Sequence, residues 1–170
     1  MVLTKFELIT LLQKEVRVLL HLVSKIDSAM LDYRPTPKQR STIELLRYLT
    51  NMGPTLVRYA KGQPLDAAAM AQAIETANAR DFDETVAALA AHANVYVQLL
   101  GDMSDEDFRG ETAGFDGLPV TRGQFLVNHV IGQCAAYRTQ LFLYLKACGR
   151  DELNTMNLWG GADAPMQAAS

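Results

Sequence analysis

The chain has 170 residues, of which 49% are hydrophobic and 21% are charged, and its formal net charge is −3 at pH 7. This length suits one domain that buries a substantial core, and the composition is that of an ordinary globular protein. The slightly acidic balance, without a run of like charges, argues against a protein that binds nucleic acid by neutralising its phosphates.

The N-terminal segment predicts neither a secretion signal nor a membrane span. Charged side chains interrupt every apolar stretch there that could serve as either; they are Lys5, Glu7, Lys14, Glu15 and Arg17. We therefore expect a cytoplasmic protein that does not associate with membranes.

The first helix is predicted over residues 4–30. Its apolar side chains recur every three or four residues, the pattern of a helix that packs in a bundle. They form a seam of Ile9, Leu12, Val16, Leu19, Val23, Ile26 and Met30, flanked by Leu8, Leu11, Val18 and Leu22. This apolar face is wider than a two-stranded coiled coil requires.

A second helix is predicted to begin after Ser41. Two prolines shortly before it exclude continued helix, and Glu44, three residues after Ser41, completes a capping-box pattern. Pro54 inside this helix is a candidate kink, because a proline lacks the backbone donor and crowds the preceding turn. A breaker cluster at residues 61–64 ends the helix.

The middle of the chain predicts two more helices and a loop. The alanine-rich stretch 66–78 indicates a short extra helix with a shallow apolar face, and a third long helix begins near Asp81 or Asp83 and ends at Gly101. Residues 102–120 contain four glycines or prolines and no sustained period, so we expect a long loop without strands.

The last helix is predicted over residues 121–148, with Thr121 and Gln124 forming another capping-box pattern. Four long amphipathic helices predict an all-α four-helix bundle, with one short extra helix and a long loop before the last helix. We assign residues 1–161 to this single domain and expect residues 162–170 to form a disordered tail.

Both cysteines lie on the last helix. Cys134 and Cys148 are fourteen residues apart, which separates them by about 21 Å along the helix axis, beyond the reach of a disulfide. We therefore expect two free, buried and unreactive thiols.

The last helix also carries a polar stripe, which is the natural place to look for a functional site. His129, Gln133 and Gln140 are spaced by four and seven residues, so they share one helix face. Polar groups inside an apolar helix are costly unless they are paired or used.

Three stretches make the chain resemble the DinB/YfiT-like superfamily of bacterial four-helix bundles. They are the lead into the second helix, from Arg34-Pro35 through Ser41 to Leu49; the run Asn128-His129, Gln133 and Tyr137–Leu141; and the helix end Leu145–Gly149. The resemblance implies a divalent metal, nickel or zinc, held by one histidine on the second helix and two, four residues apart, on the last helix.

Carried over residue by residue, these ligand positions fall at Tyr48, His129 and Gln133, of which only His129 matches. A phenol must lose a proton with a pKa near 10 to become a good ligand, and an amide oxygen suits harder cations. We therefore expect a degenerate metal site without high-affinity metal and without another cofactor, unless His21 or His92 supplies a further ligand.

The resemblance leaves three functions open. The first is a metal-free bundle that binds a small molecule or acts as a scaffold, with a pocket lined by Tyr48, His129, Gln133 and Gln140. The second is a homodimer that buries the wide faces of the first and last helices. The third is a thiol transferase or isomerase with a non-standard metal site. We favour the first two together and leave enzymatic activity undecided.

Several polar side chains also have purely structural interpretations. Tyr48, His129 and Gln133 can form a hydrogen-bonded trio that fixes the helix register. Arg138 is equally suited to an ion pair or a ligand contact. We expect His92 to be solvated, and Trp159 to pack the tail over the open end of the bundle.

Overall fold

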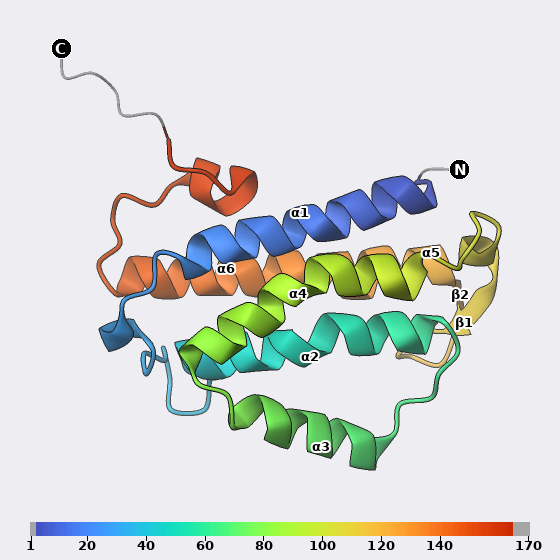
Figure 1. Ribbon diagram of the computed structural model, residues 1–170, viewed down its shortest axis with the longest axis horizontal. Helices are drawn as coiled ribbons and strands as arrows, with labels where there is room; N and C mark the ends of the chain where they lie inside the picture. The colour runs from blue at the N-terminus through green and yellow to red at the C-terminus, as the bar shows by residue number, and fades with distance from the viewer. Residues whose placement is uncertain (1–2, 165–170) are drawn as a thin grey trace.

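The structure is a computed structural model that describes residues 3–164 (Figure 1). The α-helices in this range are α1 (Lys5–Val23), α2 (Thr42–Ala60), α3 (Ala67–Asn78), α4 (Phe82–Leu100), α5 (Arg122–Phe125) and α6 (Gly132–Ala147). A π-helical segment, Leu126–Ile131, joins α5 to α6, so the three form one continuous helix. This helix forms a four-helix bundle with α1, α2 and α4, which confirms the all-α fold predicted from the sequence.

The core lies where the four long helices meet. α4 packs against both α1 and α2, and α6 packs against the same two helices (Figure 1). The largest apolar side chains that are fully buried are Leu12, Leu22, Leu45, Leu46, Leu89, Tyr96, Leu100, Phe125, Leu126, Leu141 and Leu145. Each buried leucine stabilises the fold by about 1.5–3 kcal/mol relative to an exposed one, so this core supports four helices without further elements.

The first helix is shorter than predicted. Its start is capped as the pattern indicated, since Thr4 and Glu7 form a reciprocal capping box. It ends at Val23, however, and only a 3₁₀ turn at residues 28–30 follows. Asp27 between them adopts an extended conformation, with φ −93° and ψ 154°, so the helix cannot continue to Met30. Met30 is buried all the same, which explains why the apolar period continued past the end of the helix.

The second helix begins and ends as predicted. Ser41 and Glu44 form the expected capping box, and the helix runs through Pro54 to Ala60 as one element. Gly62 follows it with a positive φ of 94°, a conformation that glycine adopts without strain.

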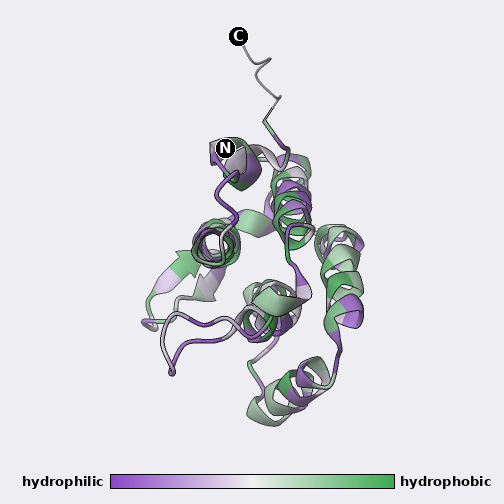
Figure 2. Cartoon of the chain, turned by 90° about the vertical axis from the view of Figure 1, so that its left-hand side faces the viewer, coloured by the Kyte–Doolittle hydropathy of each residue, from purple (hydrophilic) through white to green (hydrophobic). Residues whose placement is uncertain are grey.

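The next two helices also match their predicted positions. Asp66 caps the start of α3 through its side chain, and Asp81 forms a capping box with Glu84 at the start of α4. α3 lies outside the four-helix core and packs against α2 (Figure 1). It is coloured largely as hydrophobic in Figure 2, as its alanine content requires.

The prediction of a loop without strands over residues 102–120 was wrong. Two strands, β1 (Glu111–Ala113) and β2 (Pro119–Thr121), pair antiparallel, with Glu111 opposite Thr121. Gly117 in the connecting turn has a φ of 78°. Strands of three residues are too short to display the alternating pattern by which a strand is recognised in a sequence.

The last helix has the predicted extent, but its geometry changes along its length. The Thr121 side chain accepts a hydrogen bond from the Gln124 backbone N–H at 3.1 Å, as an N-cap does. The π-helical segment was not predicted. A π turn holds more residues than an α turn, so side chains before it and after it are rotated relative to a regular helix.

The segment after α6 folds back along the bundle instead of covering its open end. A π-helical turn, Met156–Gly160, packs on α1 and α6. Trp159 in this turn lies against Arg138, whose guanidinium carbon is 4.8 Å from the indole ring. The expected packing of Trp159 over the end of the bundle was therefore wrong.

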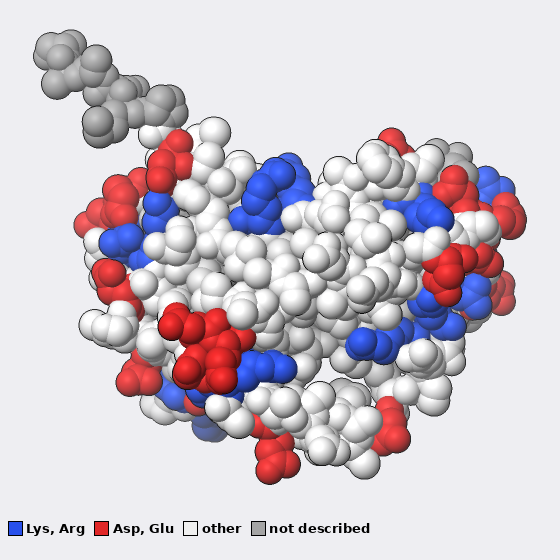
Figure 3. All heavy atoms as spheres, in the orientation of Figure 1, with Lys and Arg blue, Asp and Glu red and all other residues white. Residues whose placement is uncertain are grey.

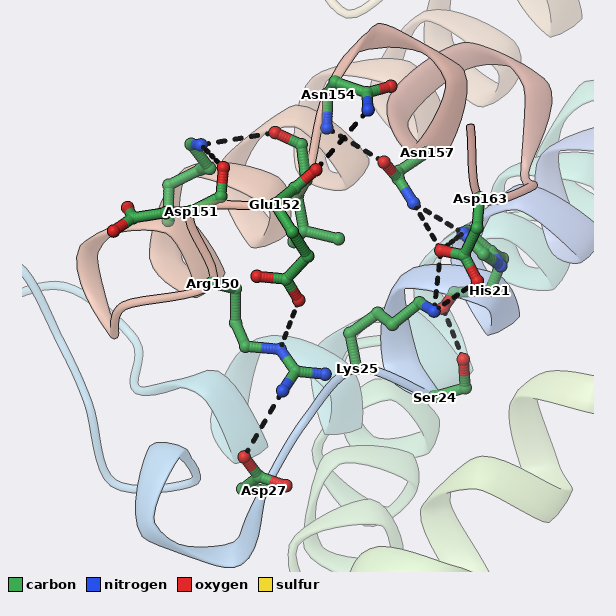
Figure 4. A network of polar contacts seen from close by, with 12 residues as sticks. His21, Ser24, Lys25, Asp27, Arg150, Asp151, Glu152, Asn154, Asn157 and Asp163 are labelled. Carbon is green, nitrogen blue, oxygen red and sulfur yellow. Dashed lines mark hydrogen bonds and ion pairs between the residues drawn. The ribbon is translucent and has the colours of Figure 1, made fainter. Parts of the chain in front are cut away.

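A network of polar contacts attaches this segment to the end of α1 (Figure 4). Lys25 Nζ lies 2.7 Å from Asp163 Oδ1, and Asn157 Nδ2 donates to the same carboxylate at 2.9 Å. Arg150 lies between Asp27 and Glu152. Asp163 belongs to the predicted tail, of which residues 165–170 lie outside the described residues.

Charged side chains lie mainly around the edges of the face shown in Figure 3, and its middle, over α4, is mostly uncharged. None of the helices between residues 3 and 164 has both the length and the apolar composition needed to cross a membrane.

Both cysteines are free thiols, as predicted, but both are only half-buried instead of fully buried. Burial raises the pKa of Cys134 to about 12, so its reactive thiolate form is scarce at neutral pH. Burial also raises the pKa of Cys148.

Candidate ligand-binding groove

A groove of about 680 Å³ lies between α2 and α3. α2 contributes Glu44, Arg47, Tyr48, Asn51, Met52, Thr55 and Leu56, and α3 contributes Met70, Ala73, Ile74, Ala77 and Asn78. Arg40, Leu65, Phe115 and Gln133 complete the lining. The volume is within the range of about 300–1,000 Å³ that is usual for small-molecule sites.

α2 separates this groove from the core because two different faces of the helix are used. Tyr48, Met52 and Thr55 are three or four residues apart, so they share the face towards α3. Leu49 and Val57 lie on the other side and are buried in the core. The same helix thus supplies both the core and one wall of the groove.

α3 forms the second wall and is anchored to α2 by polar contacts. Asn51 Nδ2 donates to the Ala73 carbonyl at 2.9 Å. Arg47 donates through Nε and Nη2 to the Arg80 carbonyl, just beyond the end of α3, with Nε at 2.9 Å. Because these bonds engage the backbone of the α3 region, its apolar side chains remain available to the groove.

Apolar side chains on this outer wall are unusually exposed. Met70 is 40% exposed and Ile74 is 51% exposed, although both carry large apolar surfaces. Leu65, which precedes α3, is 40% exposed. Apolar surface that lines a concavity in this way is available to a ligand.

Arginine and tyrosine side chains meet at the start of α2. The Arg40 guanidinium carbon lies 4.0 Å from the centre of the Tyr48 ring, a cation–π arrangement. Tyr48 also packs edge-on against Tyr137, with 5.2 Å between ring centres. Burial, together with Tyr137, raises the pKa of Tyr48 to about 12, so its phenol is protonated at neutral pH.

His129 lies in an aromatic cluster at the hairpin end of the groove. Its ring centre is 4.6 Å from that of Phe115 and 4.7 Å from that of Phe125. Tyr59 packs on both phenyl rings, at 6.2 and 5.3 Å. Phe115 also lines the groove, whereas His129 itself does not.

The structure brings together only some of the predicted pocket residues. Tyr48 and Gln133 line the groove, and His129 adjoins it through Phe115. Gln140 belongs elsewhere: its Nε2 donates to the Tyr144 hydroxyl at 2.5 Å, and that hydroxyl donates to the Arg40 carbonyl at 3.0 Å. The alternative trio does not form, since no hydrogen bond among residues 3–164 joins Tyr48, His129 and Gln133.

The sequence did not predict two parts of the groove: the outer wall formed by α3, and Phe115 in the turn between β1 and β2. The shallow apolar face of residues 66–78 was a signal for the wall, because a helix with little to bury either lies outside the core or covers something apolar. Phe115 left no signal, since its place depends on a hairpin that the sequence pattern did not reveal.

The implied metal does not fit this set of donors. A phenol with its pKa raised to about 12, an amide and one imidazole packed between phenyl rings form a poor site for nickel or zinc. The other histidines do not complete it, because the described part of the chain contains no cluster of three or more His, Cys, Asp or Glu suited to a metal ion.

His92 and His21 instead have structural partners. His92 is buried, contrary to the expectation that it is solvated, and its Nε2 lies 2.9 Å from the Thr50 carbonyl oxygen. Burial lowers its pKa. His21 Nε2 lies 3.1 Å from Asn157 Nδ2, within the network that attaches the C-terminal segment.

Comparison with known proteins agrees with the fold and with the resemblance drawn from the sequence. No functionally curated protein matches this chain. The DinB superfamily matches over residues 11–136, about three quarters of the chain, and this range covers most of α1, all of α2, α3 and α4, and the π-helical segment with His129. The chain therefore belongs to the DinB superfamily.

Proposed function

We propose that this protein binds a small, largely apolar molecule in the groove between α2 and α3, without a metal. The observation that carries this proposal is the groove itself, whose 680 Å³ suit a small molecule. Its walls combine apolar side chains such as Met52, Leu56 and Ile74 with a few polar groups, the composition that is usual for ligand sites.

The polar groups of the groove would orient the ligand. Tyr48 and Gln133 line it from two different helices, α2 and α6. A phenol and a carboxamide can both donate and accept hydrogen bonds, so they can recognise a polar atom of either kind. Binding at this place would also use two of the four residues that the sequence nominates.

Metal-dependent thiol transfer or isomerisation is the weaker alternative. It needs a Lewis acid that lowers the pKa of a thiol, and the donor set of Tyr48, His129 and Gln133 does not suit one. Cys134 of the protein itself cannot serve as the reacting thiol, because burial raises its pKa to about 12.

The test uses N-phenyl-1-naphthylamine, an apolar probe that fluoresces when it leaves water. We expect saturable binding to the purified, tag-free protein, and we expect Ala73→Trp to abolish it by filling the groove. Ala71→Trp is the matched control, because Ala71 is exposed on the same helix and does not line the groove. If the probe does not bind, or binds both variants equally well, the proposal is wrong.

A homodimer is the second candidate, and the observation that favours it lies on α4 and not on the first and last helices that the sequence nominated. The outer face of α4 is free of charge over the middle of the molecule (Figure 3), and Val97 on this helix is 43% exposed. We expect sedimentation equilibrium to give twice the monomer mass of 18.8 kDa, and Val97→Glu to restore the monomer. A wild-type monomer at micromolar concentration would contradict the dimer.

A further inference from the structure

We infer that the ligand of this groove is an organic anion with an apolar body, whose acidic group binds beside Arg40. The inference rests on the proposed function and adds that the ligand is negatively charged. Three observations support it: where the charged side chains lie in the groove, which of them already have partners, and how apolar the rest of the lining is.

All formal charge in the lining lies at one end of the groove. Two arginines and one glutamate contribute it, namely Arg40, Arg47 and Glu44, and they lie before or within the first two turns of α2. No other lining residue is acidic or basic. The cations therefore outnumber the anions where the groove begins.

The glutamate at this end is already engaged. Glu44 Oε2 accepts the Ser41 backbone N–H at 2.8 Å, and Oε1 lies 3.1 Å from Arg34 Nη2. The Ser41 backbone bond, followed by Arg34, holds the pKa of Glu44 below its usual range. Because Arg34 pairs with this carboxylate, Arg40 and Arg47 face the groove without a countercharge of their own.

The two arginines differ in how far they are committed. Arg47 donates Nε and Nη2 to the Arg80 carbonyl, so its position is determined by the fold. The Arg40 guanidinium is stacked on Tyr48 at 4.0 Å and is exposed. Within residues 3–164 it donates no hydrogen bond, and only its backbone carbonyl is engaged, by Tyr144.

A stacked arginine is well suited to bind an anion. Stacking on an aromatic face restrains the guanidinium and leaves its N–H edge free, and that edge matches a carboxylate with two parallel hydrogen bonds. Tyr48 therefore has a role that the sequence did not suggest, because it presents Arg40 to the anion.

The rest of the groove suits an uncharged body. Beyond Tyr48 the lining is dominated by Met52, Leu56, Leu65, Met70, Ile74 and Phe115. A charged group in this part would lose its hydration without gaining a partner of opposite charge. A ligand that satisfies both ends therefore carries one acidic terminus and an apolar remainder.

The test is the displacement of N-phenyl-1-naphthylamine by three compounds of equal chain length: decanoate, decanol and decylamine. One charge-assisted contact corresponds to about a tenfold gain in affinity, so we expect decanoate to bind about tenfold more tightly than decanol. We expect decylamine to be the weakest of the three, because its cation meets Arg40 and Arg47.

Arg40→Gln identifies the residue responsible. This variant should bring decanoate to the affinity of decanol and leave decanol unchanged. Lys38→Gln is the matched control, since Lys38 is an exposed cation in the same connection that does not line the groove, and it should preserve the preference. Circular dichroism of both variants checks that the fold is intact.

The outcomes separate this inference from the proposed function. If decanoate and decanol displace the probe equally well, or if Arg40→Gln leaves the preference intact, the inference is overturned while the groove remains a binding site. If the probe itself fails to bind the wild-type protein, the proposed function fails and the inference fails with it.

Discussion

Arg138 Nη1 lies 2.5 Å from Glu15 Oε2, so one ion pair joins α6 to α1 inside the bundle. Arg138 is only 2% exposed, and its Nε and Nη2 have no hydrogen-bond partner among residues 3–164. The indole of Trp159 lies over the guanidinium. The charge of Arg138 is therefore balanced by one carboxylate and covered by one aromatic ring.

We expect Glu15→Gln to lower the free energy of unfolding by about 3 kcal/mol, because it leaves a buried cation without its countercharge. Urea denaturation followed by circular dichroism measures this. The double variant Glu15→Leu with Arg138→Met should lose much less than the sum of its single changes, since it removes both charges together.

The ion pair between Lys25 and Asp163 supplies the control. Asp163 is largely exposed, and solvent screens a surface ion pair of this kind, so the pair contributes little to the free energy of unfolding. Asp163→Asn should therefore change the free energy of unfolding by less than Glu15→Gln does. Equal losses for the two variants would contradict the buried role of Arg138.

The parts of the fold that could be predicted are those decided by residues close together in the sequence. The starts of α2 and α4 were predictable because Ser41 and Asp81 cap their own helices, and capping is decided by neighbouring residues. The end of α1 was not predictable, because Met30 lies in the connection after the helix and is still buried, and a periodic pattern does not distinguish such a residue from a helical one.

Close packing of α2 on α4 depends on a glycine. A Cβ atom built on Gly53 would overlap the Tyr96 hydroxyl and lie 3.2 Å from its Cζ atom. Tyr96 is buried, so its ring has little room to move. We expect Gly53→Ala to destabilise the protein by about 1–3 kcal/mol, the usual result of overpacking a core.

Two further variants test this explanation by thermal unfolding. Tyr96→Phe removes the clashing oxygen, so Gly53→Ala should be much better tolerated in that background. Gly132→Ala should be neutral or stabilising, because its Cβ would meet only the Val127 carbonyl oxygen, at 3.6 Å. A loss from Gly53→Ala that persists in the Tyr96→Phe background would contradict the steric cause.

His92 makes the stability depend on pH. Its pKa in the folded state is lowered by burial, so the unfolded chain binds a proton more readily than the folded one. The stabilisation is complete above the ordinary value of 6.5 and is lost as the pH falls below it, towards the lowered folded pKa. At higher pH the histidine is neutral in both states and adds no slope.

We expect His92→Gln to flatten the fall in the free energy of unfolding between neutral and mildly acidic pH, as measured by urea denaturation at several pH values. The amide can still donate to the Thr50 carbonyl, which makes this a conservative change. The difference between wild type and variant isolates His92 from His21 and His129. Parallel profiles would show that His92 does not contribute.

The candidate site was predictable only along the two helices that carry sequence signals. Tyr48 and Gln133 line the groove, but His129 lies in the π-helical segment, where four residues no longer place side chains on one regular α-helical face. Gln140 is seven residues beyond Gln133, about 10 Å along the axis, and hydrogen-bonds Tyr144 at a different place. The outer wall and Phe115 depend on tertiary packing.

Restoring the ligands that the superfamily resemblance implies is the sharpest test of this correspondence. Tyr48→His with Gln133→His would supply three imidazoles together with His129, a set suited to nickel or zinc. Phe115 packs on the His129 ring, with 4.6 Å between the ring centres, and this contact obstructs the approach of a metal ion to the imidazole. We therefore expect the double variant to bind metal weakly, and the addition of Phe115→Ala to strengthen binding.

Isothermal titration of tag-free protein with nickel and with zinc measures both steps. Phe115→Ala alone is the control, since it uncovers His129 without adding ligands and should bind no more metal than the wild type. If the triple variant binds no more tightly than this control, Tyr48 and Gln133 do not occupy the ligand positions. In that case the π-helical segment has turned His129 away from them, and the correspondence with the superfamily's metal site is wrong.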